Sequence, residues 1–330
     1  MFSNNLPNDI KAILPEIKID KLRGEADFYG ISSVIAKQLG LLKVPRSYSM
    51  WRHGWMHQPL EFVEQVIWQS GHQFKYLVAT KEHANFLKTK GINNARAVGL
   101  PFVYIPDQKV HRKKNSLLLM PAHSLPYVNL SGYDDEEAMI SMAISLQNEF
   151  ELVCFCVHGD CVKNGRYIKR LDELQIPWFV GASASDSNSL IRLRRIFEYF
   201  DVVGSNVVGS HMVYSQYCGA RFFFIEPYFT YRSDMFREDR LFREESPLKS
   251  HLLKYSSLEE VRKNFKNYFV KPHEAICDQA FSASECGADC KIPVNELRYL
   301  LGWSLGVQLL GFIRSSLQRC IRLGSRLRNC

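Results

Sequence analysis

The sequence lacks the features that most quickly place a chain in a functional class. Its 330 residues contain no low-complexity tract and no internal repeat of fixed period, which excludes disordered and solenoid proteins. There is also no P-loop motif, no G-x-G-x-x-G pattern after a predicted strand and no H-E-x-x-H zinc-protease motif. With 46% hydrophobic and 23% charged residues, the composition is that of a globular protein long enough for two domains.

Paired cysteines and a secretory leader are missing as well. The 9 cysteines are an odd number at irregular spacing, and the first residues contain neither a basic n-region nor an apolar h-region. Reduced thiols and a cytoplasmic location are therefore expected, with peripheral attachment to the inner face of the plasma membrane as the alternative. Cys286 and Cys290 lack the second ligand pair of a structural zinc site, so no metal is expected there.

A polar, basic stretch at 105–115 separates two apolar regions and is interpreted as a linker between domains. After it, short apolar runs alternate with helical patterns, which indicates parallel strands joined by right-handed crossovers. The run at 116–120 has no polar residue after its first serine, as expected for a strand buried on both faces. The expected strands are 116–120, 151–157, 177–180, 201–203 and 220–225, and the expected helices are 134–149, 164–174, 187–200 and 209–217.

The first half is less regular but has the same character, with helices expected at 60–70 and 81–90 and strands at 74–79 and 95–98. The predicted fold class is therefore α/β, with two Rossmann-like domains facing a cleft. The predicted ranges are 1–108 for the first domain, 109–292 for the second and 293–330 for a C-terminal basic amphipathic helical tail.

The tail begins with an uncharged run at 299–313, which is too short to span a bilayer. Farther on, Ile313, Leu317 and Ile321 share one helical face, and residues 314–330 carry arginines without any acidic residue. A helix of this kind can lie in an anionic membrane interface. The alternative is a terminal helix that packs its apolar side on the domains.

The segment 201–225 is the most informative for chemistry. A strand is followed by a Gly-Ser-Asn turn and by a second Gly-Ser that opens a helix. Open α/β sheets bind ligands beyond the carboxyl ends of their strands, and a helix N-terminus offers free N–H groups to phosphate oxygens. Gly204 and Gly209 would allow close backbone approach. The alternative is that Ser205, Asn206 and Ser210 act only as helix caps.

A second segment, Met120 to Ser124, follows the first strand of the same domain. The carboxyl ends of parallel strands meet at one edge, so His123 and His211 are expected on the same edge of the sheet. A histidine at this position can donate to a phosphate or to the charge that develops on a leaving group.

The pattern S-N-x-x-G-S-H-x-x-Y-x-x-x-x-G-A-R-F-F-F at 205–224 resembles the donor-binding segment of GT-B-type nucleotide-sugar glycosyltransferases of lipopolysaccharide and capsule polysaccharide biosynthesis. The P-x-H-S element at 121–124 resembles the start of the nucleotide-binding domain in the same group. F-L-x-x-x-G-I at 86–92, followed by G-L-P at 99–101, resembles the end of an acceptor-side domain. The resemblance covers about residues 50–230, and it implies that 1–108 is the acceptor-side domain and 109–292 the nucleotide-sugar-binding domain.

The resemblance also implies site residues and cofactor use. His123 corresponds to a donor-side histidine. The chain lacks the Asp-x-Asp metal motif of the other main glycosyltransferase fold and the E-x7-E pattern of many retaining enzymes, so metal-independent, inverting transfer without a cofactor is expected. The residues assigned to the donor phosphate and nucleotide are Gly204, Ser205, Asn206, Gly209, Ser210, His211 and Glu226.

An inverting transfer needs a base for the acceptor hydroxyl and donors for the leaving phosphate. The base is expected from the first domain. His53 is the first candidate, with His57 as the alternative in the same cluster and Asp27 and Glu25 as the acidic alternatives. His123 is the remaining catalytic residue, on the donor side. Trp51, Trp55 and His57 are assigned to acceptor binding, because tryptophan rings can stack on sugar faces. The alternative for this Trp/His cluster is a buried structural loop.

The expected function is transfer of a sugar from a nucleotide-sugar donor to a cell-surface polysaccharide or lipid-linked acceptor. The alternatives are a polyol-phosphate transferase that uses a CDP-linked donor, and a non-catalytic nucleotide-sugar-binding or scaffold protein. The expected partners are the donor, the glycan or lipid-linked acceptor and, through the tail, an anionic membrane surface. No nucleic-acid partner is expected, because the basic residues are dispersed and no recognition motif is present.

Overall fold

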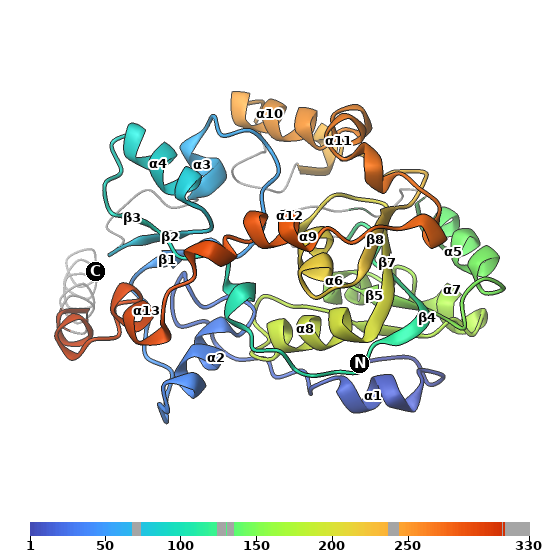
Figure 1. The fold of residues 1–330 in the computed structure, drawn as a ribbon, viewed down its shortest axis with the longest axis horizontal. Coiled ribbons are helices and arrows are strands. Elements are labelled where there is room, and N and C mark those ends of the chain that lie inside the picture. Colours follow the sequence, from blue (N-terminus) through green and yellow to red (C-terminus); the bar gives the residue numbers. More distant parts are fainter. Residues whose placement is uncertain (68–73, 124–129, 131–134, 237–243, 312, 314–330) are drawn as a thin grey trace, which may run out of the picture.

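Two parallel β-sheets organise the chain (Figure 1). One lies within residues 1–108, called the first half below, and the other within residues 109–292, called the second half. The computed structural model describes residues 1–67, 74–123, 130, 135–236, 244–311 and 313. The first sheet has the order β1-β2-β3 and lies before the predicted linker. Its strands are β1 (Met50–Trp51), β2 (Tyr76–Val78) and β3 (Ala95–Ala97).

The second sheet begins at Lys113, within the last residues of the predicted linker at 105–115, and has the Rossmann order. Its strands are β4 (Lys113–Leu119), β5 (Leu152–Val157), β6 (Trp178–Val180), β7 (Phe200–Ser205) and β8 (Arg221–Phe224). They lie side by side in the order β6-β5-β4-β7-β8, with every pair parallel. The direction of winding therefore reverses between β4 and β7, and the loops that follow these two strands are where such a sheet binds its ligand.

Successive residues of the central strands enter opposite hydrophobic clusters. Leu117 and Leu119 belong to one cluster with Phe155, whereas Leu118 belongs to the other with Cys154. Helices α5 (Asp135–Leu146) and α7 (Ile168–Glu173) close the first cluster. Helices α8 (Ser189–Tyr199) and α9 (Ser210–Tyr217) close the second. The prediction of strands buried on both faces, and with it the α/β fold class, is confirmed.

One predicted helix of the second half is shorter than expected. The predicted helix at 164–174 is represented by α7 alone, and a separate helix that was not predicted, α6 (Gly159–Lys163), precedes it. Gly165 and Tyr167 have φ angles of 72° and 68°, so the chain turns through the left-handed region between the helices. The other predicted strands and helices from 116 to 225 are present where the structure describes them; residue 134 lies outside the described residues.

The first half contains α1 (Asn8–Ile13), α2 (Ile31–Gln38), α3 (Val63–Val66) and α4 (Lys81–Thr89). Helix α4 was predicted, and Thr80 caps it by accepting a hydrogen bond from the backbone N–H of His83. The predicted helix at 60–70 is represented by α3 alone, and 68–70 lie outside the described residues. Helices α1 and α2 were not predicted.

The remaining helices follow β8: α10 (Pro247–Tyr255), α11 (Leu258–Asn264), α12 (Gln279–Glu285) and α13 (Val294–Leu300). The N-terminal segment and the described helices α12 and α13 contact elements of both halves. The backbone N–H of Ser3 donates to the carbonyl of Trp178 at 2.9 Å, and α1 contacts α8. Helix α12 packs on α9, while α13 contacts α2 beside the first sheet (Figure 1). The ranges 1–108 and 109–292 thus separate the two sheets, whereas the N-terminal segment packs on the second half.

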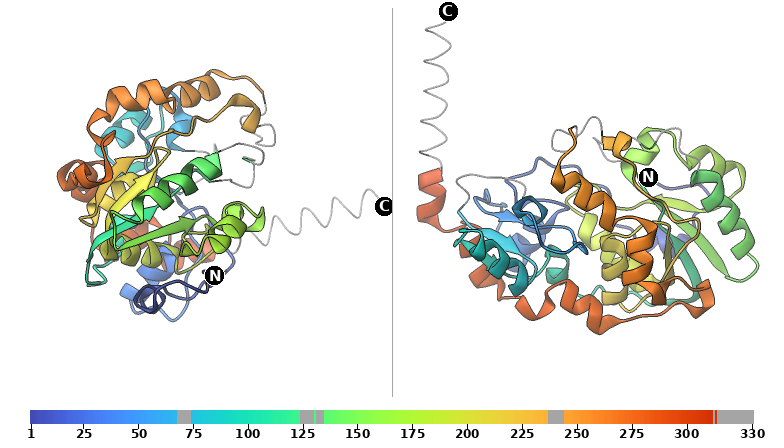
Figure 2. Two further views of the ribbon diagram at one scale, coloured as in Figure 1. Left: turned by 90° about the vertical axis from the view of Figure 1, so that its right-hand side faces the viewer. Right: turned by 90° about the horizontal axis from the view of Figure 1, so that it is seen from above.

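A further helical segment follows α13 at 305–311, with residue 313 also helical, and stands at the end of the molecule that carries the first sheet (Figure 2). The predicted basic part of the tail, 314–330, lies outside the described residues. Within the described residues, no helix is long and apolar enough to cross a bilayer.

Candidate active site

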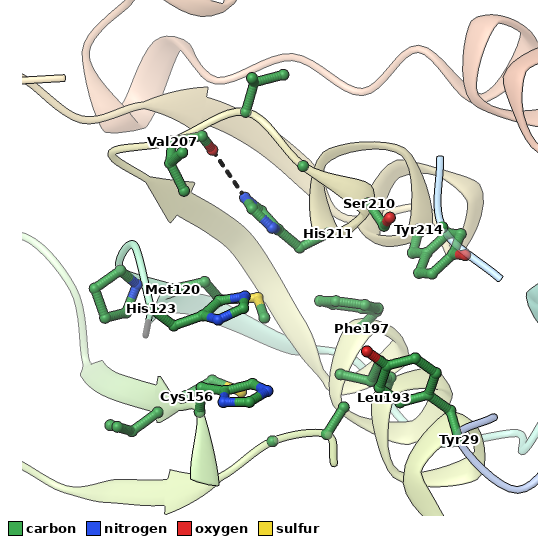
Figure 3. A pocket seen from close by; sticks show the side chains of 18 of the residues that line it. Tyr29, Met120, His123, Cys156, Leu193, Phe197, Val207, Ser210, His211 and Tyr214 are labelled. Carbon is green, nitrogen blue, oxygen red and sulfur yellow. Dashed lines mark hydrogen bonds between the residues drawn. The ribbon is translucent and has the colours of Figure 1, made fainter. Parts of the chain in front are cut away.

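A cavity of about 210 Å³ lies where the carboxyl ends of the two sheets face each other (Figure 3). The second sheet contributes the segments that follow β4, β5, β6 and β7, and the first sheet contributes His53 and Gly54, which follow β1. Tyr29, just before α2, completes the wall on the side of the first half. The cavity therefore occupies the switch point between β4 and β7, and the predicted cleft between the two halves is present.

The N-terminus of α9 opens into this cavity. Ser210 and His211 line it, and no side chain caps the helix at Gly209. The first N–H groups of a helix have no partner within the helix and carry a partial positive charge. The arrangement is suited to an anion such as a phosphate, as expected from the Gly-Ser-His sequence at 209–211.

His211 is held in one tautomer. Its Nε2 lies 3.1 Å from the carbonyl oxygen of Val207 (Figure 3), and a carbonyl can only accept, so Nε2 carries the proton of the neutral ring and Nδ1 carries the lone pair. Burial, with a second contribution from His123, lowers the pKa of His211 to about 4. The side chain is therefore neutral at pH 7 and presents an acceptor nitrogen. This suits a base better than the phosphate ligand expected from the sequence.

His158 forms a stacked pair with His123. The ring centroids are 4.2 Å apart and the planes are 10° from parallel. The Nδ1 of His158 accepts the backbone N–H of Asp160 at 3.2 Å, which leaves Nε2–H as the donor of the neutral ring. Burial lowers the pKa of His158 to about 3, with a second contribution from His123. Both rings line the cavity, so His123 lies in it as predicted, together with a histidine that the sequence analysis did not assign.

The loop after β1 is fastened to α9 by two hydrogen bonds. The hydroxyl of Tyr214 donates to the carbonyl of His53 at 2.9 Å, and the backbone N–H of Trp55 donates to the hydroxyl of Ser210 at 2.9 Å. The ring of Tyr214 also stacks on Phe102, with centroids 4.2 Å apart. These contacts join the two halves at the edge of the cavity.

His53 lines the cavity, as the prediction of a base from the first half requires. Its ring packs against Phe28 and Tyr29, with centroid distances of 4.5 and 5.3 Å. Burial, with a second contribution from the neighbouring Arg52, lowers the pKa of His53 to about 3. His53 is thus a neutral side chain at pH 7.

Three of the predicted donor-binding residues are packed in the protein interior, behind the residues that line the cavity. Ser205 is fully buried, and its hydroxyl donates to the carbonyl of Met120 at 2.6 Å. The side-chain oxygen of Asn206 accepts the backbone N–H of Ala122 at 2.8 Å. A Cβ on Gly204 would lie 2.6 Å from the ring of Phe223. These residues join the ends of β4 and β7. None of the three lines the cavity, so they support the site without facing a ligand there.

Two further predicted residues lie away from the cavity. Glu226 is exposed and forms an ion pair with Arg262. Asp27 is buried, accepts the backbone N–H of Arg23 at 2.8 Å and lines a separate, smaller depression. Neither carboxylate faces the cavity. The expectation that they act on the nucleotide or as the base is corrected by these positions.

The predicted acceptor-binding aromatic residues are packed inside the protein. Trp51 is 1% exposed and donates its Nε1–H to the carbonyl of Gly99 at 2.9 Å. Trp55 is 8% exposed and donates its Nε1–H to Glu285 at 2.6 Å. The Nε2 of His57 lies 3.0 Å from the carbonyl of Tyr255. Buried rings cannot stack on a sugar, so the interpretation of this cluster as a structural loop replaces the predicted acceptor site.

A signal for His158 was present in the sequence. It follows the buried strand β5, and parallel strands end at the same edge, so it belongs with His123 and His211. Its neighbour Cys156, at the end of β5, also lines the cavity and carries a thiol. Burial raises the pKa of the Cys156 thiol to about 12, which keeps it protonated and unreactive. Tyr29 had no comparable signal, because the segment that carries it reaches the cavity only through the tertiary fold.

The described part of the chain contains no group of three or more His, Cys, Asp or Glu side chains arranged to hold a metal ion. The cavity offers instead one helix N-terminus and four neighbouring imidazoles, those of His53, His123, His158 and His211.

No family model matches the chain, and no curated protein matches it. Among solved structures it resembles the wall teichoic acid polymerase TagF, at 12% identity over 76% of this chain and 69% of the other, with a TM-score of 0.35. A TagF variant gives 10% identity, the same coverage and a TM-score of 0.36. A mutant of S. aureus TarM in complex with fondaparinux, α-GlcNAc-glycerol and UDP gives 11% identity over 72% and 54% of the two chains, with a TM-score of 0.31. Similarities of this size carry no argument about function, which therefore depends on the geometry above.

Proposed function

We propose that the protein is a nucleotide-donor transferase that moves a glycosyl or polyol-phosphate group to an acceptor hydroxyl, without a metal and, for a glycosyl group, with inversion. The observation that carries the proposal is the uncapped N-terminus of α9. It opens into a cavity that four histidines line, at the switch point of a Rossmann sheet. Both kinds of donor carry the transferred group on a nucleotide phosphate, so one phosphate site serves either chemistry.

The donor phosphate is proposed to bind the backbone N–H groups of Ser210 and His211, with the Nε2–H of His158 as a further donor. As the bond to the transferred group breaks, negative charge collects on the phosphate oxygens. Preorganised N–H groups in a site screened from water stabilise such charge strongly. The neighbouring His123 holds the ring of His158 by stacking on it.

His211 is proposed to act as the base. The acceptor hydroxyl transfers its proton to Nδ1 of His211 while its oxygen bonds to the transferred group and the nucleotide phosphate leaves. A phosphate bound at the N-terminus of α9 raises the pKa of His211 from about 4, because an adjacent anion favours the imidazolium. The carbonyl of Val207 accepts from Nε2–H throughout and keeps the ring oriented.

The proposed acceptor is the one expected from the sequence, a hydroxyl of a glycan or of a lipid-linked cell-surface polymer. The protein would bind this acceptor on the cytoplasmic side of the membrane. The acceptor is proposed to enter past His53 and Tyr29, which form the wall contributed by the first half. The buried Trp51 and Trp55 have no part in this proposal.

The test combines donor binding with turnover. CMP-, CDP-, UDP- and GDP-linked donors are titrated by calorimetry against the wild type and against His158→Ala and His211→Gln. We expect one nucleotide class to bind, and His158→Ala to weaken it about tenfold or more through loss of a hydrogen bond to a charged group. His211→Gln should keep donor affinity within about threefold but lower kcat by roughly 10²–10⁴-fold.

Two results would contradict the proposal. If no nucleotide-linked donor binds at millimolar concentration, the transferase assignment fails. If His211→Gln loses donor affinity while kcat at saturating donor is unchanged, the site remains but the base is wrongly assigned.

A further inference from the structure

The last described helical segment exposes a continuous apolar face. Leu305, Leu309, Leu310 and Ile313 are 84%, 62%, 59% and 52% exposed. Counted from Leu305, the other three follow after four, five and eight residues, which places all four on one side of a helix. Leucines scattered singly on a surface are ordinary, but four large apolar side chains on two turns of one helix form a patch of the kind that marks an interaction site.

The opposite side of this helix is fixed to the body of the protein. The side-chain amide of Gln308 donates to the carbonyls of Arg46 and Gly302, at 2.9 and 2.7 Å. A Cβ on Gly311 would lie 2.0 Å from the hydroxyl of Tyr48, so the helix backbone rests directly on that ring. The apolar face is therefore held pointing outward by contacts on the other face.

Aromatic and basic side chains surround the base of the helix. The backbone N–H of Phe74 donates to the carbonyl of Tyr48, and the Phe74 side chain is 41% exposed. Lys75 lies over the ring of Phe74 at 5.8 Å, and Arg46 lies over the ring of Tyr48 at 5.7 Å. Aromatic rings and cations at the edge of an apolar face are typical of segments that lie at a lipid–water interface.

A groove of about 430 Å³ adjoins this region. Lys75, Arg96 and Tyr299 line it, together with one acidic residue, Glu296. The sequence that follows, 314–330, contains five arginines and no acidic residue. The apolar face is thus set among positive charges, which fits an anionic partner.

We propose that the helical segment 305–313, with Phe74 and Lys75 at its base, docks on an anionic lipid bilayer. The apolar side chains enter the headgroup–acyl boundary, and the cations meet the lipid phosphates. The charges favour a bilayer over a second copy of the chain, because self-association through this face would bring two basic segments together. The membrane role expected from Leu317 and Ile321 thus gains a described surface that begins earlier in the chain.

The surface lies apart from the cavity. It adjoins the amino ends of β1 and β2, whereas the cavity adjoins the carboxyl end of β1 and the carboxyl ends of the second sheet. A bilayer bound there leaves the cavity open, and docking does not depend on the proposed transferase function.

The experiment is co-sedimentation of the full chain with phosphatidylcholine vesicles, with and without about one-third phosphatidylglycerol. We expect binding to the anionic vesicles and weakening with added salt, because surface charges are screened. The double variant Leu305→Ser/Leu309→Ser should lose affinity for the anionic vesicles by about tenfold or more, because two exposed side chains would no longer enter the bilayer. The matched control is Leu42→Ser, which changes a leucine that is 102% exposed on the loop after α2.

Each outcome decides the question. Both substituted leucines are exposed, so circular dichroism and donor titration are expected to match the wild type, and this separates failure of docking from failure of the proposed function. Equal vesicle binding by wild type and double variant would overturn the proposal, as would a wild type that binds neither vesicle. A wild type that is dimeric in solution and becomes monomeric on substitution, with no vesicle binding, would show that the face joins two copies.

Discussion

At the scale of single residues, the site depends on how closely the backbone can approach the imidazole of His211. A Cβ on Gly209 would lie 3.0 Å from Cε1 and 3.1 Å from Nδ1 of that ring. The φ of Gly209 is −178°, which any residue adopts, so Gly209→Ala strains the ring position and not the backbone.

We expect Gly209→Ala to lower kcat by about tenfold or more, because small displacements of a catalytic group are costly. Its effect on the free energy of unfolding should stay near 1 kcal/mol or below, as for other helix N-cap exchanges. Steady-state kinetics and urea unfolding measure the two. Gly159→Ala is the control, since its nearest new contact would be at 3.9 Å. A Gly209→Ala enzyme with wild-type kcat would show that the position of Nδ1 is unimportant.

The position of Glu226 differs between the sequence-based prediction and the structure. The sequence places it toward the nucleotide, whereas the structure places it on the surface beside Arg262. An exposed ion pair contributes little, about 0–1 kcal/mol, so Glu226→Gln should leave donor affinity within about twofold of wild type. Calorimetric titration checks this. A tenfold loss of affinity would restore Glu226 to the donor site.

Sequence patterns located the candidate site. They could not separate the residues that line the cavity from the residues that hold the surrounding backbone in place. Ser205 and Ser210 both follow a glycine at the same sheet edge. Ser205 holds the carbonyl of Met120 from within the core, whereas Ser210 lines the cavity. The direction of a short polar side chain after a strand is set by tertiary packing, which no local pattern records.

At the scale of elements, the second sheet was predictable because each strand is a short apolar run between helices. Strand β7 packs so closely on β8 that Gly204 has room for no side chain: a Cβ there would lie 2.6 Å from the ring of Phe223 and 3.1 Å from Cδ1 of Ile225. The first sheet, with strands of two and three residues, and helices α10 to α13 gave weaker patterns. Such short elements are stabilised by tertiary contacts more than by local propensity.

We expect Gly204→Ala to lower the free energy of unfolding by about 1–3 kcal/mol through overpacking between β7 and β8. Urea unfolding followed by circular dichroism measures this. Gly159→Ala serves again as the control, because it adds a methyl group where there is space. A Gly204→Ala protein as stable as wild type would mean that the glycine is not required by packing and would reopen its assignment to the donor site.

At the scale of the whole molecule, the cavity and the packing around it hold several histidines in their neutral form. Burial is the first cause in each case, and it lowers the pKa of His53 and His158 to about 3 and of His57, His83 and His211 to about 4. In the unfolded chain these side chains have pKa values near 6.5. The unfolded state therefore binds more protons than the folded state between pH 6.5 and 4.

Stability from these groups is fully present above pH 6.5 and is lost as the pH falls below it, because protons stabilise the unfolded chain. The free energy of unfolding should be nearly constant from pH 8 to 7 and should then decrease toward pH 5, with a slope of up to about 1.4 kcal/mol per pH unit for each buried histidine. Urea unfolding at half-unit intervals tests this above the range in which most carboxylates titrate. His57→Gln keeps an N–H donor for the carbonyl of Tyr255. It should reduce the slope of the free energy of unfolding against pH by the contribution of one buried histidine, up to about 1.4 kcal/mol per pH unit. A stability that is flat from pH 7 to 5 would show that the imidazoles are hydrated, and the low-dielectric cavity on which the proposed chemistry depends would then not exist.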